Sequence, residues 1–305
     1  MAISAKDVME LRKQTDCGMM ECKKALTQAD GDFEKAIEIL REQGLAAANK
    51  KAGRIAAEGM VYAVSFDNCA VVVEVNAETD FVAKNDKFVA FVKEATQVIM
   101  KQNPADVEAL MACKTENGET VDEALKNLIL VIKENIKVRR FVRYEGVCSA
   151  YVHGGGTHGI LVNFETTNGI EAKDEFVTYG KDIAMQVAAA NPGYVDEASV
   201  PAEVVAKEKE IMLAQMAGDP KTANKPEAVK QKMIEGKIKK FFKENCLVDQ
   251  EFVKDSDLTV AQYTAKVAKD LGGDIKIVKF TRFQKGEGLE KRADDFAAEV
   301  ASMVK

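Results

Sequence analysis

The first 55 residues place their apolar side chains at the three-to-four-residue spacing of short amphipathic helices. Ser4 and Asp7 have the spacing of a capping box, so we expect a helix to begin there and to run to Gln14. A second helical pattern opens at Gly18, and a third follows a break at residues 30–32. The pattern therefore predicts a bundle of three short helices, followed by a helix-prone connector.

Met19 and Met20 stand at the start of the second predicted helix. Neighbours on a helix point about 100° apart, so both side chains can hardly enter one small core. A methionine left outside is an adaptable contact side chain, which makes the pair a candidate for partner binding. The alternative is that one of the two simply packs inside the bundle. By spacing alone, the nearby Lys23 and Lys24 form a solvated face.

The pattern changes to strands after the connector. β-Branched and aromatic residues lie on either side of Asp67 and Asn68, which predicts a β-hairpin over residues 60–75. Helical patterns follow at residues 88–98 and 121–136. This part of the chain therefore reads as a hairpin backed by helices.

An internal repeat supports this organisation. Residues 136–144 recur as residues 275–283, with apolar matched to apolar and basic to basic at most positions. A second hairpin, over residues 148–164, and a helix over residues 176–190 precede the second of these segments. Two amphipathic strands can resemble each other by chance, but the matching order of hairpin, helix and strand favours a duplicated unit.

The second copy is longer than the first, and its surplus lies between Asn191 and Asn245. Apolar residues follow a helical spacing on both sides of a break at residues 218–220, amid many lysines and glutamates. We expect an inserted antiparallel pair of helices that leans on the core or on a second protein. A basic nucleic-acid arm is the alternative, but it would lack interleaved aromatic side chains.

Composition narrows the function. The 43 Lys and Arg against 49 Asp and Glu give a net charge of −6, which disfavours a main role in gripping nucleic acid. No leader segment and no span apolar enough for a bilayer appears in the 305 residues, so a soluble cytoplasmic protein is expected. Six scattered cysteines without a CxxC pair predict reduced thiols.

The chain shows no catalytic constellation. His153 and His158 are its only histidines, and they flank the glycines at residues 154–156. No helix follows to cradle a phosphate, so we interpret the glycines as a hairpin turn. The histidines lack a cysteine or acid at ligand spacing, which favours an exposed pair over a metal site. We expect no metal and no cofactor.

The segment between the first hairpin and its helix is unusual. Thr79 is placed to cap a short turn that would hold Asp80 and Phe81 side by side at its tip. An acid beside a bulky aromatic on such a loop can act as a wedge for a partner. From spacing alone, burial of Phe81 in the local core is favoured. The residues alone thus lead to an interaction protein with a repeated α+β core.

At these residues the chain resembles the translation elongation factor Ts family, the bacterial nucleotide exchange factors of the GTPase EF-Tu. The similarity spans nearly the full chain. The matching segments are Thr15 with residues 18–26, then 30–32, 74–76, 79–84, 151–154, 183–189, 235–241, 252–254, 286–291 and 295–300.

The resemblance implies an α+β fold in which a ubiquitin-associated-like (UBA-like) three-helix bundle precedes a duplicated core of small antiparallel sheets with helices. An antiparallel coiled coil is inserted in the core, and a C-terminal helical module follows. The implied parts are 1–55 for the UBA-like domain and connector, 56–144 for core subdomain 1, 145–191 with 245–284 for core subdomain 2, 192–244 for the coiled coil, and 285–305 for the C-terminal module.

The resemblance also implies the contacts with EF-Tu, in its GDP-bound and nucleotide-free forms. Residues implied to displace Mg²⁺ from EF-Tu are Thr79, Asp80, Phe81 and Val82, and residues implied to bind the partner are Met19, Met20, Lys23, His153 and Val253. The chain departs from the family where Thr157 and His158 replace a common Arg-Ile, and where Glu251 replaces a common proline. A homodimer through the coiled coil is a further option, whereas no membrane or direct nucleic-acid contact is implied.

The implied mechanism needs no covalent chemistry. A protein that binds the nucleotide-free GTPase better than the loaded one must weaken nucleotide binding by the same factor. Two other classes compete with this reading. A thiol-dependent enzyme lacks Cys-His-acid spacing, and a ubiquitin-type adaptor without exchange activity would use only the first 50 or so residues.

Overall fold

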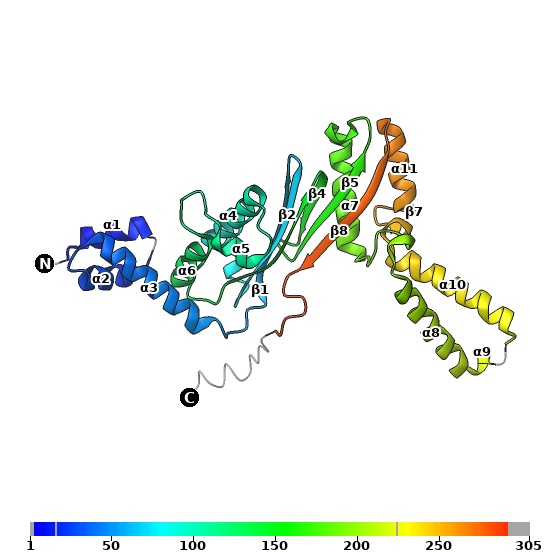
Figure 1. Cartoon of the computed structure of the whole chain (residues 1–305), viewed down its shortest axis with the longest axis horizontal. Helices are drawn as coiled ribbons and strands as arrows, with labels where there is room; N and C mark the ends of the chain where they lie inside the picture. The colour runs from blue at the N-terminus through cyan, green and yellow to red at the C-terminus, as the bar shows by residue number, and fades with distance from the viewer. Residues whose placement is uncertain (1–2, 16, 224, 292–305) are drawn as a thin grey trace.

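A computed structural model describes residues 3–15, 17–223 and 225–291 of the chain. Three helices form the N-terminal bundle, as the pattern predicts, around a core that includes Leu11, Cys22, Leu26 and Leu40. Ser4 and Asp7 form the expected reciprocal cap at its start. These helices are α1 (Ala5–Thr15), α2 (Met19–Gln28) and α3 (Phe33–Lys51). The third helix continues through most of the connector (Figure 1).

The first sheet has the strand order β1-β2-β3 and is antiparallel throughout. Its elements are β1 (Glu58–Phe66), β2 (Cys69–Ala77), the 3₁₀ turn η1 (Val82–Lys84), α4 (Asp86–Gln102), α5 (Val107–Ala112), α6 (Val121–Ile132) and β3 (Lys137–Glu145). The hairpin turns at Asp67 and Asn68, as predicted. The helix predicted over residues 121–136 ends earlier, because Lys133 adopts a left-handed conformation with φ of 66°.

The second sheet has the order β4-β5-β8 and is again antiparallel. Its elements are β4 (Val147–His153), β5 (His158–Thr166), the 3₁₀ turn η2 (Ile170–Ala172), α7 (Asp174–Ala190), α11 (Val260–Leu271) and β8 (Ile275–Gln284). The recurring segments 136–144 and 275–283 therefore lie at the same place, as the third strand of each sheet. Each sheet also has a bulge in its third strand, opposite the sixth residue of the middle strand, Glu74 or Asn163.

The two sheets face each other, and helices cover their outer faces. Alternate residues of β2, such as Val71 and Val73, contact α4 and α6, whereas Val72 points the other way. Val72 packs with Leu161 and Phe283 of the second sheet in a small core between the sheets. Ile160 and the other outward residues of that sheet pack against α7 and α11. Each sheet is therefore buried on both faces, which fixes the two halves against each other.

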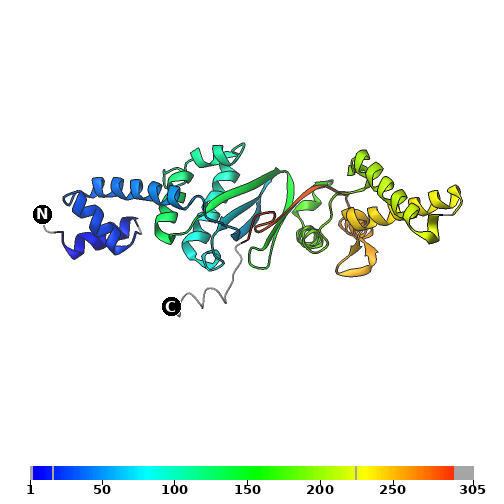
Figure 2. The same cartoon turned by 90° about the horizontal axis from the view of Figure 1, so that it is seen from below.

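The predicted insertion forms a helical hairpin that projects from the second half, at the opposite end of the elongated molecule from the N-terminal bundle (Figure 2). It consists of α8 (Ala202–Gly218), the single turn α9 (Pro220–Ala223) and α10 (Glu227–Asn245). Its core holds Met212, Met216, Ile234 and Ile238, whereas Ile211 and Val229, also part of the predicted apolar spacing, are exposed. The amide of Gly193 donates to the carbonyl of Asn245, so the ends of the insertion are adjacent.

Several short elements have no counterpart in the sequence-based prediction. They are α5, α9, α11, the 3₁₀ turns η3 (Glu197–Ser199) and η4 (Leu247–Asp249), and the ribbon of β6 (Glu251–Phe252) and β7 (Asp255–Thr259). The implied C-terminal helical module lies outside the described residues, apart from the turn at its beginning. Among the described helices, none combines the length and apolarity that a membrane span requires.

Candidate partner-binding site

The loop after β2 presents two exposed side chains on a fixed base. Phe81 has 80% of its surface exposed, and Asp80 beside it is exposed as well. Val82 is buried in the core under the first sheet, and the amide of Lys84 donates to the carbonyl of Phe81. We call residues 78–84 the tip loop. The burial of Phe81 that spacing alone favoured is wrong, because the 3₁₀ turn directs Val82 inward instead.

Hydrogen bonds from the loop before β3 hold the tip loop in place. Glu134 accepts from the backbone amide of Thr79 at 3.0 Å and from its hydroxyl at 2.7 Å. Glu78 accepts from the amide of Asn135 at 2.6 Å and pairs with Arg54 at 3.3 Å. The predicted capping role of Thr79 is therefore wrong, since its hydroxyl donates to Glu134 and the short turn has no side-chain cap.

The N-terminal bundle contacts the same region. Met19 and Met20 are 39% and 62% exposed at the start of α2, and Lys23 is exposed one turn later. Both methionines thus lie outside the core of the bundle. Glu21, between them and Lys23, pairs at 2.9 Å with Lys133, the residue before Glu134. Residues 133–135 therefore connect the exposed methionines to the tip loop.

His153 and His158 lie on the turn between β4 and β5, which residues 154–157 form. The hydroxyl of Tyr151 lies 3.0 Å from Nδ1 of the exposed His153, and the two imidazole rings are 6.1 Å apart. His158 is half-buried, so the predicted exposed pair is correct only for His153. Burial, with the nearby Arg282, holds the pKa of His158 below its usual value, so this ring is neutral at neutral pH.

The glycine turn and the tip loop lie at the same end of the paired sheets. The amide of Val61, near the start of β1, donates to the carbonyl of Gly156 at 2.8 Å. Gly156 has φ of 103°, and a Cβ there would lie 2.9 Å from that of Met60, so only glycine allows this approach. The start of β1 pairs with the end of β2, where the tip loop begins. The fold therefore brings Phe81 and His153 to one end of the core.

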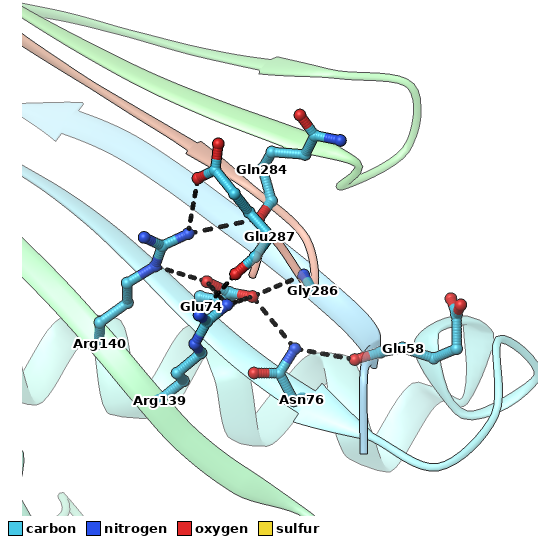
Figure 3. A network of polar contacts seen from close by, with 8 residues as sticks. All are labelled: Glu58, Glu74, Asn76, Arg139, Arg140, Gln284, Gly286 and Glu287. Carbon is cyan, nitrogen blue, oxygen red and sulfur yellow. Dashed lines mark hydrogen bonds and ion pairs between the residues drawn. The ribbon is translucent and has the colours of Figure 1, made fainter. Parts of the chain in front are cut away.

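A buried ionic network lies at this end as well (Figure 3). Glu74 of β2 is fully buried and pairs with Arg139 at 3.0 Å and with Arg140 at 2.6 Å. It also accepts from the amide of Gly286, in the turn after β8, at 2.8 Å. Sequence reasoning did not single out Glu74. The available signal was an acid between Val73 and Val75 in an otherwise apolar strand.

The remaining candidate residue, Val253, is exposed at the turn between β6 and β7. Its amide donates to the buried side chain of Gln186 on α7 at 2.8 Å. Glu251, one of the two departures from the family pattern, pairs with Lys243 of α10 at 2.8 Å. This ion pair links the ribbon to the base of the insertion.

The arrangement suits binding rather than bond-making chemistry. Among the described residues, no three His, Cys, Asp or Glu side chains gather as a metal site. Burial raises the pKa of Cys17, Cys22, Cys69 and Cys148, and that of Cys246 to about 11, which opposes thiolate formation at neutral pH. The exposed Asp80 and Phe81 instead offer a charge and an apolar wedge.

Comparison with known proteins gives consistent matches. The family model described as Elongation factor TS matches residues 78–287. Elongation factor Ts of Syntrophotalea carbinolica is 48% identical over the full length of both chains. Elongation factor Ts of Clostridium novyi is 48% identical over 98% of this chain and 97% of its own, and that of Clostridium perfringens is 46% identical over 99% of both.

Proposed function

Because the chain belongs to the elongation factor Ts family, it is a nucleotide exchange factor for EF-Tu in translation elongation, and we propose that its tip loop drives the release of GDP. It is not an enzyme. Translation elongation proceeds in the cytoplasm, so the chain acts there. The observation that carries the proposal is the 80% exposed Phe81 on a loop whose backbone is held by Glu134 and Asn135.

Exchange follows from coupled binding. A factor that binds nucleotide-free EF-Tu more tightly than EF-Tu·GDP lowers the affinity for GDP by the same ratio. Phe81, as an apolar wedge, gains about 2 to 3 kcal/mol when a pocket of the partner buries it. A side chain already exposed and fixed in position loses little conformational freedom on binding, which favours this use.

Asp80 acts through its negative charge at the Mg²⁺ site of EF-Tu. Mg²⁺ bridges the phosphates of a bound nucleotide and depends on oxygen ligands in a defined arrangement. An aspartate brought to that site changes the arrangement of ligands and charge, which loosens the ion and the phosphates it holds. Thr79 and Val82 support the two exposed residues from below, one by its bonds to Glu134 and the other by its burial.

The other contacts with EF-Tu come from three separate parts of the chain. Met19, Met20 and Lys23 form the exposed start of α2, His153 lies on the glycine turn, and Val253 lies on the β6–β7 turn. Each is exposed, which is what a contact residue requires. The contact near His153 differs from the common family pattern, because Thr157 donates to the carbonyl of His153 at 3.0 Å.

We propose the same organisation that the resemblance implies. Residues 1–55 are a UBA-like domain with its connector, residues 56–144 and the pair 145–191 with 245–284 are duplicated subdomains, and residues 192–244 are an antiparallel coiled coil. The equivalent strands and bulges of the two sheets support the duplication. A C-terminal helical module over residues 285–305 completes the proposal.

The coiled coil also offers a surface for a homodimer. Ile211 and Leu213 are exposed on opposite sides of α8, on either side of Met212, which packs against α10. Replacing both with lysine leaves Met212 in place and charges both exposed sides of α8. If the chain forms a homodimer through α8, sedimentation equilibrium should give the mass of a dimer for wild type and half that mass for the double variant. The mass of a monomer for both wild type and variant argues against the dimer and does not affect the exchange proposal.

The function is tested by release of a fluorescent GDP analogue from EF-Tu, with and without the chain. We expect strong acceleration by the chain, and binding without acceleration would favour an adaptor. Asp80→Asn should slow release most in millimolar Mg²⁺ and least in excess chelator, where the ion is already gone. An equal deficit in both conditions would contradict a role for Asp80 at the Mg²⁺ site.

A further inference from the structure

Glu74 is the only fully buried acid among the described residues, and its partners come from the first sheet and from the turn that follows β8. Arg140, its direct cross-strand neighbour, donates to it at 2.6 Å and to the carbonyl of Gln284 at 3.3 Å. The Arg140 guanidinium also lies 4.1 Å from the ring centre of Phe283 of β8. A single carboxylate and one arginine therefore join β2 and β3 to the end of the second sheet.

The turn after β8 closes on this network. Arg139 donates to Glu74 and, at 2.6 Å, to the carbonyl of Glu287. Lys285 pairs with Glu58 at the start of β1, and its amide donates to the carbonyl of Thr157 on the glycine turn. Residues 284–287, which we call the closing turn, thus contact the first sheet (Figure 3). Through Lys285 they also contact the turn that carries His153.

The equivalent position in the second sheet behaves differently. Asn163 of β5, which lies opposite the bulge in β8, donates to the carbonyls of Glu145 and Val147 at 3.1 Å, where β3 passes into β4. A neutral amide is sufficient there, because it binds only backbone oxygens and one sulfur. The first sheet instead has an acid with two arginines, which is costly to bury and stable only when every partner is in place.

We infer that Glu74 is a positioning residue for nucleotide exchange: through Arg139, Arg140 and the closing turn it holds the tip loop and the glycine turn at a fixed separation. The inference rests on the proposed contacts of Phe81 and His153 with EF-Tu. The tip loop begins four residues after Glu74, beyond Asn76, whose side-chain amide also donates to Glu74 at 3.1 Å. The glycine turn is held through Lys285, the neighbour of Gly286.

A fixed separation of the tip loop and the glycine turn strengthens binding to EF-Tu. Two contacts held by one rigid body lose less conformational freedom on binding than two contacts that move independently. Once the complex has formed, EF-Tu itself holds both elements. Loss of the network should therefore raise the concentration of factor needed for half-maximal exchange. It should change the rate at saturation little.

Two variants disturb the network from different sides. Glu74→Gln keeps the volume and removes the charge that pairs with the arginines. Gly286→Ala leaves Glu74 intact but adds a Cβ 2.2 Å from the carbonyl oxygen of Ala57, at φ of 67°. The second variant lies outside the hydrophobic core, so it keeps the test open if the first one folds poorly. Glu145→Gln is the matched control, since Glu145 pairs with Arg143 at the far end of β3.

Hydrogen–deuterium exchange of the full chain measures directly how firmly the closing turn is held. In Glu74→Gln and Gly286→Ala we expect faster exchange at the closing turn and at Val61, whose amide donates to Gly156, with the interior of both sheets still protected. Glu145→Gln should leave these amides unchanged. Unaltered protection of the closing turn and Val61 in both network variants would overturn the proposal.

GDP release from EF-Tu over a range of factor concentrations gives the functional result. Both network variants should need about tenfold more factor for half-maximal exchange, with the saturated rate within about twofold of wild type, whereas Glu145→Gln should match wild type. Leu110→Ala, which destabilises the first core away from this network, controls for stability alone and should not shift the half-maximal concentration.

The contacts with EF-Tu and the positioning role of Glu74 are tested by different variants. If Phe81→Ala and His153→Ala exchange nucleotide like wild type, the proposed contacts are wrong, whatever the network variants do. If these variants are impaired but the network variants loosen the closing turn without raising the half-maximal concentration, Glu74 stabilises the fold only, and the positioning role is excluded.

Discussion

The loops that follow the middle strands of the two sheets differ sharply, although their surroundings match. Each loop leads through a 3₁₀ turn with a buried aliphatic residue, Val82 or Ile170, into a 17-residue helix. The first loop exposes Asp80 and Phe81. The second, at Asn168, is bound to the end of α11, where the side-chain amide donates to the carbonyl of Gly272 at 2.9 Å.

This comparison separates framework from function. The helix and the buried aliphatic residue are the same in both loops because packing against a sheet requires them. The residues before the 3₁₀ turn are free to differ because the packing of the helix on the sheet does not depend on them: Phe81 is exposed, whereas Asn168 bonds to the carbonyl of Gly272. Activity of the first loop therefore depends on very few side chains, and the second loop supplies internal controls.

The largest expected effect comes from giving the first loop the residues of the second. With the double variant Asp80→Asn and Phe81→Gly, GDP should leave EF-Tu about 100-fold more slowly than with wild type. The variant removes the wedge and the charge together. Its thermal unfolding should stay close to wild type, because both side chains are exposed. Stopped-flow release and circular dichroism measure the two quantities, and a fully active double variant would show that the loops are interchangeable.

The next effect concerns the support of each loop. Glu134→Gln weakens the two bonds that hold Thr79, and hydrogen bonds to a charged acceptor contribute about 1.5 to 3 kcal/mol, so exchange should fall by about tenfold. Asp274→Asn is the control, since Asp274 accepts from Thr167 in the second loop at 3.2 Å. Equal losses in both variants would contradict a specific role for the first loop.

The third prediction concerns the insertion, whose removal makes the second half of the core about as long as the first. Deleting Val204 to Lys240 and closing the gap with a short linker should leave a cooperatively folded core, because the ends of the insertion are adjacent. Urea unfolding should still show a single transition. A broad, non-cooperative transition would mean that the insertion is part of the core.

The smallest expected effect is the pH dependence of the stability that Glu74 contributes. Burial alone would raise the pKa of Glu74, but hydrogen bonds from Gly286, Asn76 and Arg140 outweigh it and hold this pKa below its ordinary value of 4.5. The stabilisation is therefore complete above about pH 4.5 and is lost as the pH falls through the lower folded-state pKa. Glu74→Gln should cost about 1 to 3 kcal/mol at pH 7 and less at pH 3. Asn163→Ala should show a cost that does not depend on pH, and a pH-independent cost for Glu74→Gln would contradict this account.

Local sequence predicted the framework well. The cap at Ser4, the two hairpin turns and the recurring third strands all depend on residues close together in the chain, and the structure has each of them. The ribbon of β6 and β7 has only short strands, which give no clear alternation of apolar and polar residues. Periodicity is informative only where an element is long enough to repeat it.

The supports of the site were beyond such reasoning. Thr79 looks like a cap from its neighbours, but its partner Glu134 lies 55 residues away. Glu74 obtains its partners from residues 139, 140 and 286, which only the folded chain brings together. Spacing alone favours burial of Phe81 and leaves its exposure as the alternative, and the resemblance to a known family favours that alternative.

The central claim is that Phe81 of the tip loop, and no residue of the second loop, drives GDP release. The most direct test is stopped-flow release of a fluorescent GDP analogue from EF-Tu in millimolar Mg²⁺, with wild type, Phe81→Ala and Asn168→Ala compared side by side. Phe81→Ala should slow release by about 10- to 100-fold, as loss of about 2 to 3 kcal/mol of contact energy implies, with an unchanged unfolding midpoint. Asn168→Ala should behave as wild type. Release at the wild-type rate with Phe81→Ala, or loss of its folded state, would contradict the claim and make Phe81 a structural residue.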